Sequence, residues 1–130
     1  MNKPRKTKLS EIFFWSHFLI FAGWFLPFFI PVSVWSNKIY YHVWYMIFVL
    51  SINYVWGFVF LLKLNKYVIA CPWTTITQWL RGFDITNPKN YNHSFVLEIS
   101  EMWGVNMKGR YVTFVMYVSI MVAGIQLYLS

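Results

Sequence analysis

The stretch Glu11–Trp35, EIFFWSHFLIFAGWFLPFFIPVSVW, decides the fold of this chain. After Glu11 no formally charged residue occurs for 26 residues, until Lys38. About 20 apolar residues, each adding roughly 1.5 Å of rise, let a helix cross the hydrocarbon core of a bilayer. Inside that core the backbone amides can bond only to one another, so the segment must be helical. The stretch therefore predicts a membrane-spanning helix over about residues 11–35.

The composition of the whole chain agrees with a membrane protein. Of its 130 residues, 58% are hydrophobic, 23% are aromatic and 12% are charged, and this charged share is about half of that in a soluble domain. The length predicts one membrane domain over residues 1–130. The net charge is +7, but the cations flank apolar segments, so they indicate membrane topology and not nucleic-acid binding.

Two further apolar segments predict membrane-spanning helices. Residues 40–62 begin with a cluster of aromatic side chains, which is typical of a lipid–water boundary, and they end before Lys63. Residues 111–129 are uncharged and follow Arg110. With residues 11–35, these segments predict an all-α integral membrane protein with three transmembrane helices.

Small and amide-bearing residues indicate where the spans pack against protein. Small side chains let a second helix approach closely. A mid-membrane amide is expected to hydrogen-bond a neighbouring helix or, alternatively, to line a ligand site. The expected packing residues are Ser16, Gly23, Asn53, Gly57, Ser119 and Ala123. Pro27 and Pro31 predict a kink or a distorted last turn in the first span, because each removes an amide donor.

Two short segments between the second and third spans predict amphipathic helices, over residues 72–81 and 94–103. Pro72 suits the first position of a helix. The apolar face of the first helix consists of Trp73, Ile76 and Leu80. Both segments are too short to cross a bilayer, so we expect them to lie in the cytoplasmic interface or to dip into it.

The cations are distributed unevenly, and this predicts the orientation. Ten of the eleven Lys and Arg residues lie at one end of the three spans, and only Lys38 lies at the other. The positive-inside rule then places the amino terminus in the cytoplasm and the carboxyl terminus outside. The basic head includes Lys3, and the apolar run after it exceeds a signal-peptide core and lacks a small-residue cleavage site, so we expect it to remain as an anchor.

Two histidines within the spans, His17 and His42, are the candidate cofactor ligands. Each has aromatic neighbours and suits an axial ligand to a haem or a chlorophyll-type ring. Their predicted depths differ by roughly 15 Å, which excludes a shared metal or haem. The alternative is that each histidine bonds a neighbouring helix or reaches water. The sequence itself requires no cofactor.

The remaining reactive groups give no catalytic or metal motif. Cys71 and His93 are able to meet on the predicted cytoplasmic side, where they would suit an enzyme acting on lipid, but zinc needs further ligands that the sequence does not offer. Cys71 is the single cysteine, so no internal disulfide forms. Glu98 and Glu101 share a helix face, which we expect to be solvated.

Residues 71–82, CPWTTITQWLRG, resemble a known signature. It is the Cys-Pro-Leu-Thr-x-x-Glu-x-x-Leu-Arg sequence of a family of small bacterial inner-membrane proteins classed as a domain of unknown function. The matching residues are Cys71, Pro72, Thr74, Leu80 and Arg81. Trp73 replaces the leucine, and Thr77 or Gln78 replaces the glutamate. The resemblance implies a multi-pass protein of the bacterial inner membrane, and it implies no activity, because none is assigned to the family.

The function that the sequence favours is a small accessory subunit of a larger respiratory, photosynthetic or oxygenase complex in the membrane. The small-residue and amide faces require helix partners, and the aromatic content exceeds what three helices bury against one another. The alternative is a haem- or pigment-binding redox protein that uses His17 or His42. The expected partners are the bilayer and other membrane subunits, and no enzymatic activity is predicted.

The predicted orientation is testable with alkaline phosphatase, which is active only outside the cytoplasm. We expect a fusion after Ser130 to be active and a fusion after Lys66 to be inactive, because the cations gather on the side of Lys66. Immunoblots of both fusions control for expression. The reverse pattern would contradict the predicted topology.

Overall fold

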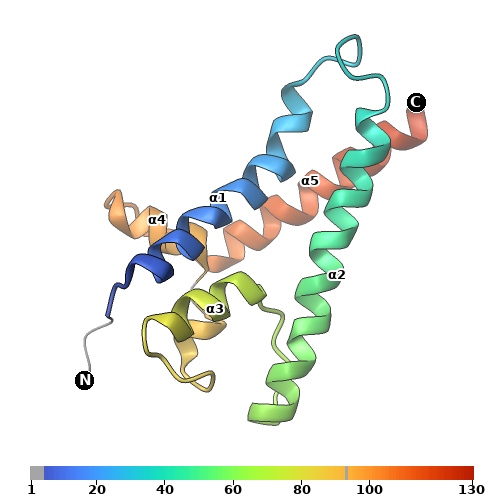
Figure 1. Ribbon diagram of the computed structural model, residues 1–130. Coiled ribbons are helices and arrows are strands. Elements are labelled where there is room, and N and C mark those ends of the chain that lie inside the picture. The colour runs from blue at the N-terminus through green and yellow to red at the C-terminus, as the bar shows by residue number, and fades with distance from the viewer. Residues whose placement is uncertain (1–4, 93) are drawn as a thin grey trace.

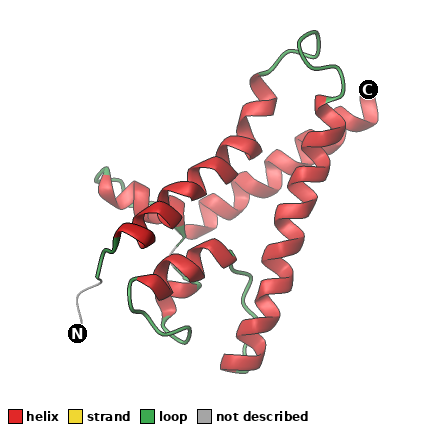
Figure 2. Cartoon of the chain, in the orientation of Figure 1, coloured by secondary structure: helices red, strands yellow, loops and turns green. Residues whose placement is uncertain are grey.

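The computed structural model describes residues 5–92 and 94–130, and the regular structure within these ranges is entirely helical (Figure 2). The long helices are α1 (Lys8–Phe29), α2 (Lys38–Leu64) and α5 (Gly109–Leu129). The short ones are α3 (Pro72–Leu80), the 3-10 helix η1 (Pro88–Asn90) and α4 (Phe95–Met102). Each long helix has the length and apolarity to cross a membrane. The predicted all-α multi-pass membrane protein is therefore confirmed.

Helix α1 begins earlier and ends earlier than the sequence predicts. Thr7 and Ser10 form a reciprocal cap, in which each backbone N–H donates to the other residue's hydroxyl oxygen, at 3.0 and 3.1 Å. This cap starts the helix at Lys8. At the other end, Ile30 is extended, because the residue before a proline, here Pro31, is disfavoured in the helical region. The predicted end at residue 35 was wrong for this reason.

Lys38 completes the carboxyl end of α1. Pro31 has no N–H, so the carbonyl of Pro27 lacks its usual donor four residues on. The Nζ atom of Lys38 donates to that carbonyl at 3.0 Å and also to the carbonyl of Ile30. The ammonium group is thereby buried at the negative end of the helix dipole. Lys38, which the sequence predicts to lie apart from the other cations, is thus a helix cap.

The three long helices meet in a small apolar core made of Trp24, Val43, Met46 and Ala123. The indole Nε1 of Trp24 donates to the hydroxyl of Ser119 at 2.7 Å, which ties α1 to α5. Gly23 lets the ring of Tyr45 lie against α1, since a Cβ atom there would stand 2.8 Å from that ring. The expected packing residues Gly23, Ser119 and Ala123 all lie at these helix contacts.

Helix α3 lies between the diverging halves of α1 and α2 (Figure 1). It runs antiparallel to the first half of α1. At its start the indole Nε1 of Trp73 donates to Ser16 at 2.7 Å. At its end Arg81 reaches Glu11 at 3.0 Å. These two contacts fix α3 alongside α1 over most of its length.

Helix α3 buries its polar face, while the predicted apolar face of Trp73, Ile76 and Leu80 is only partly buried. The buried residues on and just after it are Thr74, Thr75, Thr77, Gln78 and Arg81, while Trp79 is 65% exposed. An amphipathic helix in the interface turns its polar face to water. Arg81, at the end of α3, pairs with carboxylates on α1 and α4. The interfacial position of α3 stays a prediction.

We predict that Lys38→Met lowers the free energy of unfolding by about 2 kcal/mol, since hydrogen bonds to a charged group contribute about 1.5–3 kcal/mol. The measurement is thermal unfolding followed by circular dichroism in detergent. Lys66→Met is the matched control, because Lys66 is exposed and surface substitutions change stability by roughly 0.5 kcal/mol or less. Equal stability of the two variants would contradict the helix-cap assignment.

Candidate functional site

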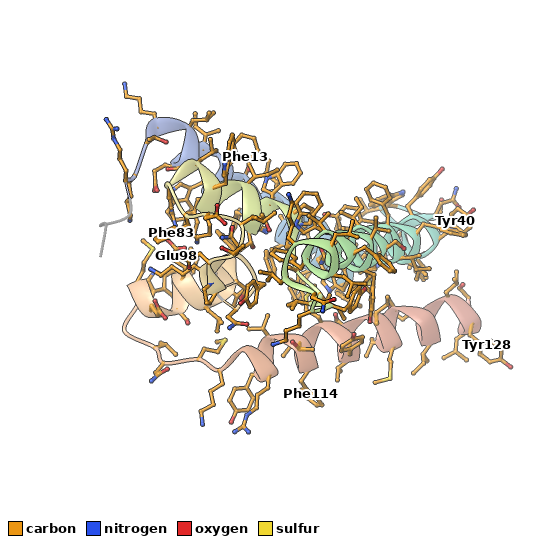
Figure 3. The ribbon with its side chains drawn as sticks, turned by 90° about the horizontal axis from the view of Figure 1, so that it is seen from below. Phe13, Tyr40, Phe83, Glu98, Phe114 and Tyr128 are labelled. Carbon is orange, nitrogen blue, oxygen red and sulfur yellow. The ribbon has the colours of Figure 1, made fainter. Side chains whose placement is uncertain are left out.

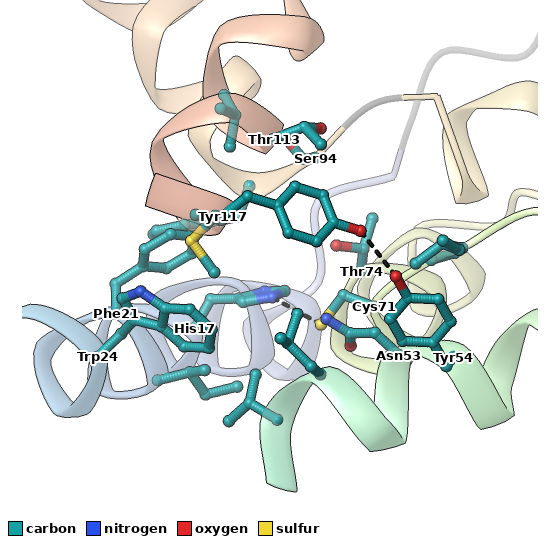
Figure 4. A pocket seen from close by; sticks show the side chains of 18 residues that line it. His17, Phe21, Trp24, Asn53, Tyr54, Cys71, Thr74, Ser94, Thr113 and Tyr117 are labelled. Carbon is teal, nitrogen blue, oxygen red and sulfur yellow. Dashed lines mark hydrogen bonds between the residues drawn. The ribbon is translucent and has the colours of Figure 1, made fainter. Parts of the chain in front are cut away.

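A cavity of about 210 Å³ lies among α1, α2, α3 and α5 (Figure 4). Its walls are mostly apolar, and a few polar side chains converge on it. These are His17, Asn53, Tyr54, Cys71, Thr74, Ser94, Thr113 and Tyr117. An apolar pocket with a few convergent polar groups is the usual form of a ligand site.

His17 and Cys71 meet in this cavity. The Nε2 atom of His17 lies 3.1 Å from the Sγ atom of Cys71, although the two residues are 54 positions apart. The imidazole is 3% exposed and stacks on the ring of Phe95, with ring centroids 5.0 Å apart and planes inclined by 14°. Stacking fixes the ring, so the thiol and the imidazole are held within hydrogen-bond distance.

Cys71 is the residue that precedes the first turn of α3. Burial raises the pKa of its thiol above the ordinary value, while hydrogen bonds from the backbone amides of Thr74 and Trp73 and from the Thr74 side chain act in the opposite direction. Amides at a helix amino terminus favour negative charge on a nearby sulfur. Burial is the larger influence, so the group is a thiol at neutral pH with a base beside it.

His42 lies elsewhere and has a different partner. Its Nε2 atom is 2.7 Å from the carbonyl oxygen of Trp24, and Phe28 packs edge-on against the ring. It borders a second, wider pocket of about 480 Å³ between α1 and α2, where most neighbours are apolar or aromatic. A histidine nitrogen that is bonded to a carbonyl is not available to ligate a metal through that atom.

Arg81 joins three helices through a buried ion network. Its Nη1 atom donates to both carboxylate oxygens of Glu98, at 2.7 and 2.9 Å, and Nη2 donates to Glu11 at 3.0 Å. The guanidinium carbon lies 5.0 Å from the ring centroid of Phe14. The Arg81 side chain is 4% exposed and that of Glu98 is 15% exposed. The expectation that Glu98 lies on a solvated face was therefore wrong.

The other predicted site residues fall in separate places. Asn53 lines the cavity, and none of the described residues forms a hydrogen bond with its amide. Gly57 lies against the ring of Tyr67, where a Cβ atom would stand 2.8 Å away. The predicted meeting of Cys71 with His93, and the basic residue Lys3, lie outside the described residues.

No group of three or more His, Cys, Asp or Glu residues gathers within residues 5–92 and 94–130 to hold a metal. Comparisons with protein-family models, with curated proteins and with solved structures find no match to this chain. The resemblance of residues 71–82 to an inner-membrane family therefore stays a prediction. The site has to be interpreted from its own geometry.

Sequence reasoning considered His17 and Cys71 separately and missed that they meet. A usable signal was present in α3, where Thr74, Thr77, Gln78 and Arg81 recur at helical spacing. A polar stripe that ends in arginine needs polar partners if it is buried. On α1, Glu11 pairs with Arg81, while Ser16 and His17 contact Trp73 and Cys71 at the other end of α3.

The raised thiol pKa predicts how Cys71 reacts with iodoacetamide. We expect the alkylation rate in native protein to rise with pH and to reach half of its maximum above pH 8.5, roughly the pKa of an ordinary thiol. The rate is followed by intact-protein mass spectrometry in detergent. Protein unfolded in dodecyl sulfate is the control and should react with the profile of a free thiol. A fast reaction of native protein that does not change between pH 6 and pH 9 would contradict the assignment.

Proposed function

We propose that this protein is a membrane thiol enzyme that accepts acyl groups from lipid-soluble esters, with Cys71 as nucleophile and His17 as general base. The observation that carries the proposal is the 3.1 Å separation of Sγ and Nε2 inside an apolar cavity. A nucleophile and a base within hydrogen-bond reach are the signature of covalent catalysis. The sequence alone does not favour an enzyme. The close approach of Cys71 and His17 is the observation that supports one.

The proposed step needs no cofactor. The Nε2 atom of His17 takes the thiol proton as Sγ attacks the acyl carbonyl carbon. The ester C–O bond then breaks, and the imidazolium returns the proton to the departing alkoxide, which leaves as an alcohol. A thioester remains on Cys71 until water or another acceptor attacks it and restores the thiol.

The start of α3 supplies donors for the charge that develops in this step. The backbone amides of Trp73 and Thr74 already hydrogen-bond the Cys71 sulfur. In the proposed step the carbonyl oxygen of the ester becomes negative next to Sγ, within the same region of the helix start. Backbone amides at a helix amino terminus stabilise such an oxyanion.

The surroundings of the cavity favour a substrate that partitions into lipid. Three of the surrounding helices, α1, α2 and α5, are apolar enough to cross a membrane. The hydroxyls of Tyr54 and Tyr117 meet at 2.7 Å between α2 and α5 (Figure 4). A molecule that reaches this cavity through the bilayer meets mostly apolar side chains, with a few polar groups that include the Cys71–His17 pair.

The test is acylation of the purified full-length protein in detergent by p-nitrophenyl octanoate. We expect an octanoyl adduct on Cys71 by intact-protein mass spectrometry, and its removal by hydroxylamine. His17→Ala should slow adduct formation by about 100-fold, the lower end of the range for a general base. His42→Gln is the matched control, because it keeps a donor for the Trp24 carbonyl, and it should acylate normally. Absence of the adduct in the wild-type protein would refute the proposal.

A second candidate is the accessory subunit of a membrane complex, in the bacterial inner membrane with a cytoplasmic amino terminus. The observation that favours it is α5, in whose most apolar stretch only 11% of residues are buried within the chain. Phe114 on α5 points away from the other helices (Figure 3). Native mass spectrometry after mild extraction tests this candidate, and a lone 15.7 kDa species would refute it.

The haem or pigment alternative finds less support in the geometry. The Nε2 atom of His17 lies against Cys71, and that of His42 lies against a carbonyl. An absorption band of a bound tetrapyrrole that disappears in His17→Ala would reverse this ranking.

A further inference from the structure

We infer that one water molecule held between His17 and Glu98 makes Glu98 the positioning residue of the Cys71–His17 pair. The inference rests on the proposed function and deepens it, because it names the group that orients His17 and exchanges its proton with the aqueous side. It is carried by a small polar chamber that shares His17, Thr74 and Phe95 with the main cavity.

This polar chamber has a volume of about 10 Å³. Its lining residues are Phe14, His17, Thr74, Thr77, Gln78, Phe95 and Glu98. A cavity of about 10–15 Å³ on this measure holds one water molecule, provided that two to four polar partners surround it. Five of the seven lining side chains are polar, so the chamber has the size and the chemistry for a single water.

Polar groups around the chamber lack protein partners. Gln78 is 3% exposed, and none of the described residues hydrogen-bonds its side-chain amide. The Nδ1 atom of His17 likewise has no hydrogen bond to a described residue, since the ring contact to Cys71 uses Nε2. Polar groups that border a cavity and have no protein partner are normally satisfied by ordered water.

The hydrogen-bond directions agree along the whole chain of groups. When Nε2 of His17 accepts the Cys71 thiol proton, Nδ1 carries a hydrogen and donates to the water. The water then donates to the carboxylate of Glu98. That carboxylate accepts two bonds from Arg81 and keeps lone pairs for a third partner.

Glu98 borders both the buried pair and a charged pocket nearer the aqueous end. This pocket has a volume of about 160 Å³ and is lined by Lys6, Gln78, Arg81, Phe83, Lys89, Glu98 and Glu101. Glu98 and Gln78 line both the polar chamber and the charged pocket. The hydrogen-bonded chain of Cys71, His17, the bound water molecule and Glu98 therefore connects the Cys71 thiol to the ionisable groups of the charged pocket. Those groups exchange protons with the solvent.

The titratable groups that face His17 come from four helices. Cys71 faces it from the start of α3 and Glu98 from α4, while Tyr54 on α2 and Tyr117 on α5 share its cavity. Glu11 and Arg81 lie one step further away, in the ion network. Of these groups, Glu98 is the carboxylate that shares a chamber with His17.

The test compares two carboxylates that bind the same arginine. Glu98→Gln and Glu11→Gln each remove one charged partner of Arg81, but only Glu98 borders the polar chamber. Iodoacetamide alkylation of Cys71 is measured from pH 5.5 to pH 10 in the purified full-length variants. A carboxylate near His17 stabilises the imidazolium that forms with the thiolate. We expect Glu98→Gln to slow alkylation at pH 7 about tenfold and to move the profile up by one pH unit, whereas Glu11→Gln leaves the profile unchanged.

A third variant keeps the inference testable if Glu98→Gln does not fold. Gln78→Leu fills the polar chamber with an apolar group and leaves the ion network intact, so it should shift the alkylation profile in the same direction. Equal profiles for wild type and Gln78→Leu, or equal shifts for Glu98→Gln and Glu11→Gln, would overturn the inference. Iodoacetamide carries no acyl group, so the alkylation profiles test the role of Glu98 separately from acyl transfer. If the profiles shift as expected but Cys71 is not octanoylated, the proposed enzymatic function is refuted and the inference about Glu98 stands.

Discussion

Pairing of the two terminal nitrogens of the buried Arg81 guanidinium with Glu11 and Glu98 is the constraint on which the rest of the structure depends. Removing a charged group from water costs several kcal/mol, and only well-placed partners offset that cost. Glu11 and Glu98 supply these partners from α1 and α4. Because Arg81 ends α3, this pairing anchors α3 along α1, and the other end of α3 then delivers Cys71 to His17. The ion network and the candidate site therefore lie at opposite ends of the contact between α3 and α1.

The spans were predictable because length and apolarity alone decide whether a helix crosses a bilayer. The residues at which the spans begin and end were less predictable. The cap between Thr7 and Ser10 and the break before Pro31 moved α1 toward the amino terminus. The side that α3 presents to the protein was not predictable from periodicity. Lipid is as apolar as leucine, so an apolar stripe in a membrane does not mark the buried face.

The sequence identified two reactive residues of the candidate site but not the contact between them. His17 and Cys71 each attracted attention as reactive groups, yet nothing in a linear reading joins positions that are 54 residues apart. Glu98 was assigned to solvent because charged residues at a span boundary usually face water. Its burial depends on the path of residues 81–94, including the 3-10 helix η1, and that path follows from tertiary contacts, not from local preference.

The cap that Lys38 forms on α1 has a consequence for assembly of the protein into its membrane. With the orientation proposed above, Lys38 is the one cation that must travel through the hydrocarbon to the far side, and an unaccompanied lysine there costs about 2.5–3.5 kcal/mol. Its ammonium group is already surrounded by carbonyl oxygens from the end of α1. In that orientation the first two helices would enter the bilayer together as a hairpin, with the charge shielded by the carbonyl groups of Pro27 and Ile30.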